Sequence, residues 1–374
     1  MKNIHIIIRW TVGLLFIFSG LIKANDPLGL SYKMQEFFEV WAWQGLHEFT
    51  LVFAMLMNVF EVVAGIAVII GWRMKLFSWL LLLLIIFFTF LTGYALFSGK
   101  IKTCGCFGDC LPLTPAQSFG KDIFLLVLIL VLFAYRNRIQ SSLRPFYAFS
   151  LLLLVTIATA AGQFYVIKHL PIIDCLPYKE GNNITEQMQT PVGAVADSFS
   201  ITFTYKKNGK QWEFDQAHFP ADFDSTYEYI ARHDRLVKKG NGLQAKIVDF
   251  SLQNMNGIDT TAAVLGQDSL YILVMAKDMN RIEDWRIAFE NIVSTAQNKK
   301  IPVFLVTADA ENAVKLLRDV PILTCDATVI KTAARATPTY FFMQQATIIA
   351  KISYADSHIV LQQMSNITVR RKGT

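Results

Sequence analysis

Charged residues are scarce in this chain: only 17% of its 374 residues are Asp, Glu, Lys or Arg, whereas 53% are hydrophobic. This share of charge, together with a mean hydropathy of +0.38, is untypical of a soluble protein. The scarcity is local, because nearly all long apolar runs lie before residue 170 and the rest reads as ordinary globular sequence. The composition therefore predicts a membrane half followed by a half that is exposed to water.

A basic surface interleaved with aromatic residues is also absent. The lysines and arginines that flank the apolar runs account for the formal net charge of +6. We therefore expect the lipid bilayer as a partner and no nucleic acid.

Five apolar runs approach the ~20 residues that a helix needs to cross a bilayer. They cover about residues 4–22, 49–70, 76–97, 117–135 and 146–167. No small-residue cleavage site follows the first run, which is therefore predicted to be an uncleaved anchor. The fourth run is the weakest, because its uninterrupted apolar part begins only at Ile123, and it spans the membrane only if Lys121 reaches the interface.

The basic residues of the short loops predict the orientation. Lys2 and Arg9 place the N-terminus in the cytoplasm, and the loops that carry Arg73 and Arg136 lie on the same side. Residues 23–48, the loop 98–116 and the whole C-terminal half are then expected outside the membrane.

Cysteines are few, and three of the five are clustered in TCGCFGDC, residues 103–110. The five are Cys104, Cys106, Cys110, Cys175 and Cys325, and none lies inside a predicted span. On the predicted topology all of them lie outside, where disulfides persist. Because the count is odd, at least one thiol is free or is bonded to another protein.

Three interpretations of the cysteine cluster compete. Cys104, Cys106 and Cys110 are candidate redox thiols, near Lys100 and Lys102, and a bridge from Cys104 or Cys106 to Cys110 is easier than one within CxC. A zinc site is disfavoured, because no histidine is near in the sequence, and no metal is predicted. A plain disulfide that stiffens the loop, worth about 2–4 kcal/mol, fits the spacing equally well.

One carboxylate, Glu61, lies near the middle of the second apolar run. An ionisable group at that depth is costly and usually faces a bundle interior or a cavity. It is either a proton-handling or quinone-site carboxylate, or a strut hydrogen-bonded to Asn58 or Tyr94.

RWTVGLLFIFSGLIKANDP, Glu61 in the second run and TCGCFGD after the third resemble the DoxX and MauE superfamily of small four-helix bacterial membrane proteins. MauE-like members are associated with the maturation of methylamine dehydrogenase, where disulfides must form correctly. The resemblance covers about residues 1–140 and implies a four-helix bundle, to which residues 141–170 add a fifth helix. It implies a redox role for Cys104 and Cys106, and less directly a role for Glu61, and leaves that of Cys110 open.

Beyond the membrane, residues 171–245 are predicted to be a linker region with a hairpin at Asn208-Gly209 and, over 212–240, a loop with some helix. From residue 246, strands and helices alternate. Strands are expected at 246–252, 270–276, 301–308, 337–343 and 347–353, and helices at 282–299 and 310–319. This order predicts an α/β layer arrangement over 246–374.

The opening IVDFSLQNMNGIDTT resembles peroxiredoxins and membrane-tethered thioredoxins, and Thr337-Pro338 stands where that fold carries its cis-proline loop, a candidate binding site. The CxxC of an active thioredoxin is missing, because MAKDMNRIEDW follows the strand at 270–276. The resemblance therefore implies a binding or docking module, with Cys325 as a buried, inert thiol. The joined architecture looks like envelope proteins of the Bacteroidetes.

Together these features predict a bacterial inner-membrane protein with a periplasmic C-terminal domain that handles thiols and disulfides outside the membrane. Cys104 and Cys106 are the expected exchanging pair, and Cys110 or Cys175 the resolving thiol. Electrons would pass to or from a quinone or an envelope protein client. The alternative is a non-catalytic assembly or docking subunit of an envelope complex, with the cysteines as staples.

Overall fold

The computed structural model describes residues 2–101, 105–195, 198–215, 218–220, 223–238, 240, 242–317 and 319–372. Cys104, a candidate redox thiol, lies outside the described residues. The chain forms two compact units: the larger consists of Met1–Gly181 and Ser251–Thr374, and the smaller of Asn182–Phe250.

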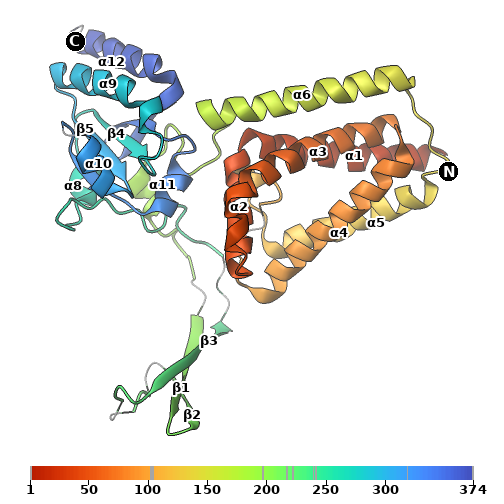
Figure 1. Cartoon of the computed structure of the whole chain (residues 1–374), viewed down its shortest axis with the longest axis horizontal. Coiled ribbons are helices and arrows are strands. Elements are labelled where there is room, and N and C mark those ends of the chain that lie inside the picture. Colours follow the sequence, from red (N-terminus) through yellow and green to blue (C-terminus); the bar gives the residue numbers. More distant parts are fainter. Residues whose placement is uncertain are drawn as a thin grey trace. The chain divides into compact units, whose positions relative to one another are not determined.

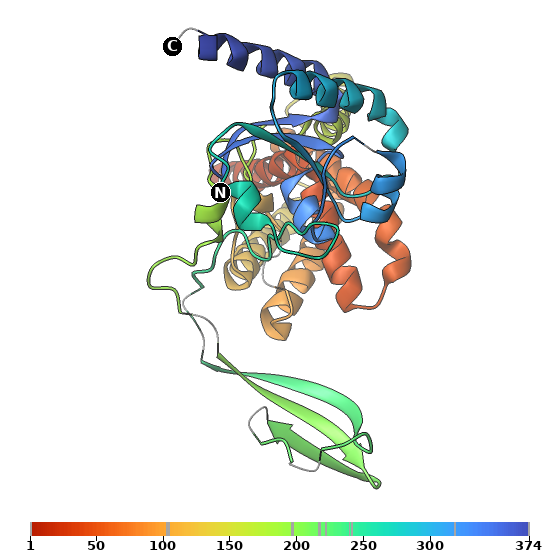
Figure 2. The same ribbon diagram turned by 90° about the vertical axis from the view of Figure 1, so that its left-hand side faces the viewer.

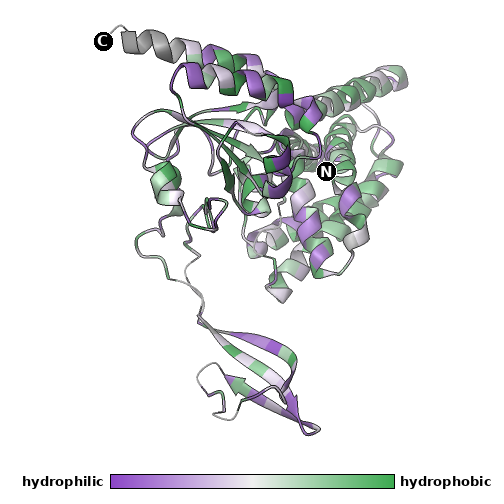
Figure 3. Ribbon diagram, turned by 60° about the vertical axis from the view of Figure 1, so that its left-hand side comes forward, coloured by the Kyte–Doolittle hydropathy of each residue, from purple (hydrophilic) through white to green (hydrophobic). Residues whose placement is uncertain are grey.

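Long helices dominate the N-terminal part of the larger unit (Figure 1). Those long and apolar enough to cross a membrane are α1 (Lys2–Asn25), α3 (Thr50–Ile70), α4 (Met74–Ser98), α5 (Pro115–Tyr135) and α6 (Pro145–His169). The uncertain fourth run thus forms a helix of sufficient length, which begins with a capping box between Thr114 and Gln117. Figure 3 shows how strongly apolar residues cover these helices. The chain is a multi-pass membrane protein.

Helices α1 and α3 pack with their backbones in near contact. A Cβ on Gly13 would lie 2.7 Å from the carbonyl oxygen of Gly65, and a Cβ on Gly65 only 2.6 Å from that of Gly13. Only glycine leaves room for this crossing, since small residues are what allow two membrane helices to approach closely. Nearer the start of α3, the Asn58 amide donates to Gln163 of α6 at 3.0 Å and fastens the fifth long helix to the bundle.

A short helix that we did not expect, α2 (Pro27–Val40), joins α1 to α3 with the 3₁₀ turn η1 (Gln44–Phe49). Its start has an ordinary sequence signal: Asp26 accepts a hydrogen bond from the Gly29 amide at 3.0 Å, and Pro27 occupies the first helical position. A second short turn, η2 (Gly108–Cys110), lies between α4 and α5. Both lie at the end of the bundle that carries residues 105–110, which is called below the cysteine-loop end.

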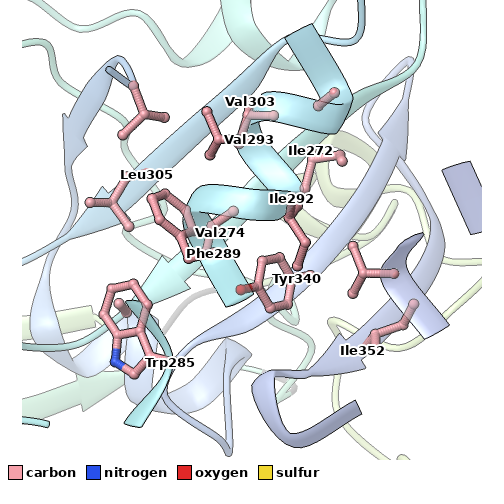
Figure 4. Close-up of a cluster of buried hydrophobic side chains, with 14 of the residues drawn as sticks. Ile272, Val274, Trp285, Phe289, Ile292, Val293, Val303, Leu305, Tyr340 and Ile352 are labelled. Atoms are coloured by element: carbon pink, nitrogen blue, oxygen red, sulfur yellow. The ribbon is translucent and has the colours of Figure 1, made fainter. Parts of the chain in front are cut away.

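The C-terminal part is a five-stranded sheet with strand order β6-β5-β4-β7-β8. Strands β4 (Tyr271–Ala276), β5 (Val303–Thr307) and β6 (Ile322–Thr324) are parallel to one another. Strand β7 (Thr339–Gln344) is antiparallel to both of its neighbours, β4 and β8 (Thr347–Ser353). The remaining elements are α8 (Thr261–Leu265), η3 (Ile282–Asp284), α9 (Arg286–Asn298), α10 (Ala310–Leu316), α11 (Ala327–Ala333), η4 (Tyr354–Asp356) and α12 (Ser357–Lys372). Trp285, Phe289 and Tyr340 fill the core between the sheet and α9 (Figure 4).

Most of the expected α/β elements form, but one expected strand does not. Residues 246–252 contain no strand, and the neighbouring Gln253 makes only single bridges with Asp259 and Thr324. We also missed β6, α11 and α12. Strand β6 has three residues, too few to show a hydrophobic period.

The smaller unit contains α7 (Ile184–Met188) and an antiparallel sheet of strand order β2-β1-β3 (Figure 2). The hairpin of β1 (Ser198–Lys207) and β2 (Lys210–Asp215) is confirmed, and Asn208 and Gly209 both have positive φ, as a type I′ turn requires. The predicted loop with some helix over 212–240 is wrong, because β3 (Glu228–Lys238) pairs with β1. Its sequence, EYIARHDRLVK, is mostly polar and lacks the alternation that marks a half-buried strand.

The core of the sheet makes a direct prediction about α9. Phe289 is 1% exposed and its ring centroid lies 5.5 Å from that of Trp285, whereas Ile287 on the same helix is 82% exposed. Phe289→Ala removes a buried ring and should lower the free energy of unfolding by about 3–5 kcal/mol. The control Ile287→Ala should change it by less than about 0.5 kcal/mol. Urea unfolding of the detergent-solubilised chain, followed by tryptophan fluorescence, measures both, and equal effects would contradict this packing.

Candidate functional site

The cysteine loop, residues 105–110, is shaped by two glycines. Gly105 and Gly108 have φ of +68° and +56°, and the Gly108 amide closes a turn by donating to the Gly105 carbonyl at 3.1 Å. Residues with a Cβ rarely adopt such φ values. The Ser19 hydroxyl of α1 donates to the Cys106 carbonyl at 3.1 Å. The loop is therefore held against the end of α1.

One cysteine of the loop forms a disulfide with the segment that follows α6. Cys110 is bonded to Cys175, 65 residues later, with the two Cα atoms 4.8 Å apart. Each of these two cysteines was considered as the resolving thiol, and the structure joins them to each other. The bridge from Cys106 to Cys110 that the spacing suggested is absent, because Cys110 has another partner and the Cys106 thiol is free.

The free Cys106 thiol lies in a buried, charged environment. Burial raises the pKa of this thiol above its ordinary value, although the ammonium groups of Lys121 and Lys23 act in the opposite direction. The thiol is therefore mostly protonated at neutral pH. The lysines that influence the pKa of Cys106 come from α5 and α1. The sequence had suggested the loop residues Lys100 and Lys102 instead. Lys100 is exposed, and Lys102 lies outside the described residues.

Cys106 lines a cavity of about 440 Å³ at the cysteine-loop end of the bundle. Side chains of α1, α2, α3, α4 and α5 complete the wall. The wall is largely apolar and aromatic, and Cys106, Ser19, Thr92 and three lysines are its polar side chains. The cavity accounts for the partial accessibility of Cys106 within an otherwise enclosed site.

Each of the three lysines is paired with a carboxylate. Lys23, 3% exposed, forms an ion pair with Glu61, which has no exposed surface. Lys121 pairs with Asp122 at 2.6 Å, and Lys33 with Glu36 at 2.8 Å. The partner of Glu61 is thus Lys23, and neither Asn58 nor Tyr94 as the sequence suggested. The wall has positive groups but little net charge.

The C-terminal α/β part contacts the cysteine loop through Arg335. Its guanidinium, 4% exposed, donates to Asp26 and to Asp109, each at 2.8 Å. Burial alone would lower the pKa of Arg335, but the two carboxylates outweigh it and raise that pKa. Tyr32 of α2 lies 5.5 Å from the guanidinium carbon, measured to its ring centroid. Asp109 precedes the disulfide cysteine Cys110, so this contact reaches the redox candidate directly.

The other sequence-predicted residues of this part lie close to Arg335 or inside the core. The Thr337-Pro338 peptide bond is cis, as expected, and Pro338 is buried while Thr337 is partly exposed. Cys325 is 7% exposed, and burial raises its pKa to about 11, which agrees with an inert thiol. No cysteine follows β4 before η3.

Sequence reasoning missed Lys23, Asp26, Lys121 and Arg335. Lys23 and Lys121 were interpreted as groups at the ends of their spans, because nothing in the local pattern marks a lysine that turns inward. Arg335 lies 309 positions from Asp26, and a pairing at that separation has no signal in one sequence.

Comparison with known families agrees with part of these observations. Residues 1–135 match the family model of the methylamine utilisation protein MauE, a match that contains α1 to α5 and the cysteine loop. Residues 199–239, which hold the three-stranded sheet, match a domain of unknown function, DUF8463. No curated protein and no solved structure matches the chain significantly. The membrane part is therefore similar to MauE.

The disulfide predicts which thiols react in the native protein. Cys175→Ser should leave Cys110 as a thiol that iodoacetamide alkylates at pH 8, whereas Cys110 in the unchanged chain should not react. Cys325, with its pKa near 11 and its burial, should react only after denaturation. Peptide mass spectrometry quantifies each site, and Cys325→Ser is the control. Alkylation of Cys110 in the unchanged native chain would contradict the bridge.

The Arg335 contact predicts a second effect. Arg335→Met leaves Asp26 and Asp109 without their shared partner. We expect the free energy of unfolding to fall by about 1–3 kcal/mol, because the arginine is buried but water, which reaches the 44% exposed Asp109, weakens that pair. Hydrogen exchange of the amides of residues 105–110 should accelerate accordingly. Arg286→Met, which breaks an exposed ion pair with Glu290, is the matched control and should leave the exchange of the loop unchanged.

Proposed function

We propose that this chain is a bacterial inner-membrane protein that exchanges thiols and disulfides with client proteins on the periplasmic side. One observation carries the proposal: a free thiol, Cys106, and a disulfide sulfur, Cys110, lie four positions apart on one small loop. Thiol–disulfide exchange requires both species in close reach. The match to MauE over residues 1–135 supports a role of this kind.

The exchange needs no reactant beyond the client. A client thiolate attacks one sulfur of the Cys110–Cys175 bond, which breaks as a mixed disulfide forms, and the released cysteine takes up a proton. The second client thiolate then displaces the loop cysteine from the mixed disulfide. The client leaves oxidised, and its two electrons remain on Cys110 and Cys175 as two thiols. Cys104 and Cys106 accept this state when they are joined as a disulfide: the Cys110 thiolate attacks that bond, the Cys175 thiolate then displaces it from Cys110, the Cys110–Cys175 bond forms again, and the two electrons remain on Cys104 and Cys106 as two thiols.

The resting loop must open before it reacts. Burial keeps the Cys106 thiol protonated, and thiolates are the attacking species. Loss of the Arg335 contact with Asp109 would let water reach the loop, which returns the pKa of the thiol toward its ordinary value. The two glycines with positive φ allow the backbone to change shape.

In this proposal the C-terminal part is a thioredoxin-like docking module for the client or an envelope partner. The parallel strands β4 to β6, the antiparallel pair β7 and β8, and the cis bond at Thr337-Pro338 support that fold. Without a cysteine after β4, the module supplies binding and no dithiol chemistry. The cis-proline loop, Thr337 and Pro338, is its proposed binding site, two residues beyond Arg335.

The alternative function also has an observation in its favour. The disulfide joins a loop before α5 to the segment after α6, as a staple would, and the neighbouring thiol is protonated at rest. A non-catalytic assembly subunit would keep this bond permanently.

Graded glutathione buffers distinguish the two functions. An exchanging loop disulfide should be half reduced in the range of about −180 to −270 mV, and Cys106→Ser should slow its reshuffling several-fold, because one attacking thiol is lost. Mass spectrometry of the alkylated chain gives the fraction reduced, with Cys325→Ser as the control. A bond still oxidised below roughly −300 mV would sink the exchange function and favour the staple.

A further inference from the structure

We propose that the cavity beside Cys106 binds the ring of a membrane quinone, which accepts the electrons of the cysteine loop. This inference rests on the proposed function, because it names the oxidant that restores the loop disulfide. Three features of the cavity support it: the opening toward lipid, the aromatic wall and the lack of net charge.

The cavity opens toward lipid between α3 and α4. Phe53 and Leu56 of α3 and Phe87 of α4 line it, yet these side chains are 42%, 63% and 43% exposed. Residues that both line a cavity and face outward from a membrane helix mark an opening into the bilayer. A ligand that is dissolved in the membrane reaches the cavity this way.

The wall suits a flat ring. Nine of the side chains that line it are aromatic, with Trp41, which follows α2, and Phe107 of the cysteine loop toward the loop end and Phe16 of α1 deeper in the bundle. Aromatic faces stack on a conjugated ring, whereas a lipid acyl chain gains nothing specific from them. The volume of about 440 Å³ falls in the range of small-molecule sites, roughly 300–1,000 Å³.

Polar donors are concentrated at one end of the cavity. Lys23, Lys121, Ser19 and Thr92 line it near the ends of α1, α4 and α5 that meet the cysteine loop, and Cys106 is among them. Ammonium and hydroxyl groups donate hydrogen bonds to carbonyl oxygens. The two carbonyl oxygens of a quinone ring would be satisfied there, next to the thiol.

The charge of the wall argues for a neutral ligand. Because Lys23, Lys33 and Lys121 are each paired with a carboxylate, the cavity offers hydrogen-bond donors without an unpaired positive charge. A phospholipid phosphate would be attracted to unpaired lysines, and here it would find acidic groups beside every one of them. A quinone carries no charge and fits the pairing.

The electron transfer balances. Two loop thiols, left by oxidation of a client, lose two protons and two electrons and form one S–S bond. The quinone takes up the two electrons and two protons and becomes a quinol. No further oxidant is needed at this step.

Binding of decylubiquinone in detergent tests the site. All ring positions of this quinone are substituted, so it does not alkylate thiols. Quenching of Trp41, which lines the cavity, reports binding as a fall in tryptophan fluorescence. Leu84→Phe places extra volume in the wall and should weaken binding by about 5- to 100-fold. Leu83→Phe, on the same helix but 59% exposed and outside the wall, should leave the affinity unchanged.

Three outcomes would overturn the site. The first is quenching that does not saturate, and the second is equal affinity in the Leu84 and Leu83 variants. The third is displacement of the quinone by decanol, which has the chain but no ring, at concentrations similar to those at which the quinone binds. The last would assign the cavity to an acyl chain. Disulfide exchange in glutathione buffers needs no quinone, so exchange without quinone binding overturns only this inference. If the cavity binds the quinone but the loop disulfide never exchanges, only the proposed function is overturned.

Discussion

The buried ion pair between Lys23 and Glu61 is the constraint on which the cysteine-loop end of the bundle depends. A lone charge of either sign in an apolar bundle would cost several kcal/mol, so each residue requires the other. The pair fixes α1 against α3 beyond the glycine crossing at Gly13 and Gly65, and places the Lys23 ammonium on the wall of the cavity. The same requirement pairs Lys121 with Asp122. Pairing thus supplies hydrogen-bond donors inside a membrane domain without leaving net charge.

The cysteine loop is fixed to two other parts of the chain at adjacent residues. Cys110 is bonded to Cys175, and Asp109 accepts from Arg335 of the C-terminal part. In the proposed function, reduction would release the first attachment, and a partner that competes for Arg335 or its carboxylates would release the second. A client that docks near the cis-proline loop would act within two residues of Arg335. In the proposed function, docking and opening of the loop would therefore be coupled through one guanidinium.

The sequence was most informative where a physical period repeats over many residues. Five helices, the hairpin at Asn208-Gly209 and the strands on both sides of α9 follow from hydropathy, turn chemistry and alternation. It failed for β6, which is too short for a period, and for β3, whose residues are polar on both faces. It also failed at 246–252, where an apolar stretch packs without joining the sheet.

The sequence by itself determined the membrane class, the clustering of thiols in one loop and the absence of CxxC in the α/β part, because these are properties of composition and spacing. Only the tertiary structure decided which cysteine is bonded to which, that Glu61 pairs with Lys23, and that Arg335 reaches Asp26 and Asp109. Those pairings join residues from 38 to 309 positions apart. Partners so distant are chosen by the packing of whole helices and sheets, and a local pattern carries no trace of that choice.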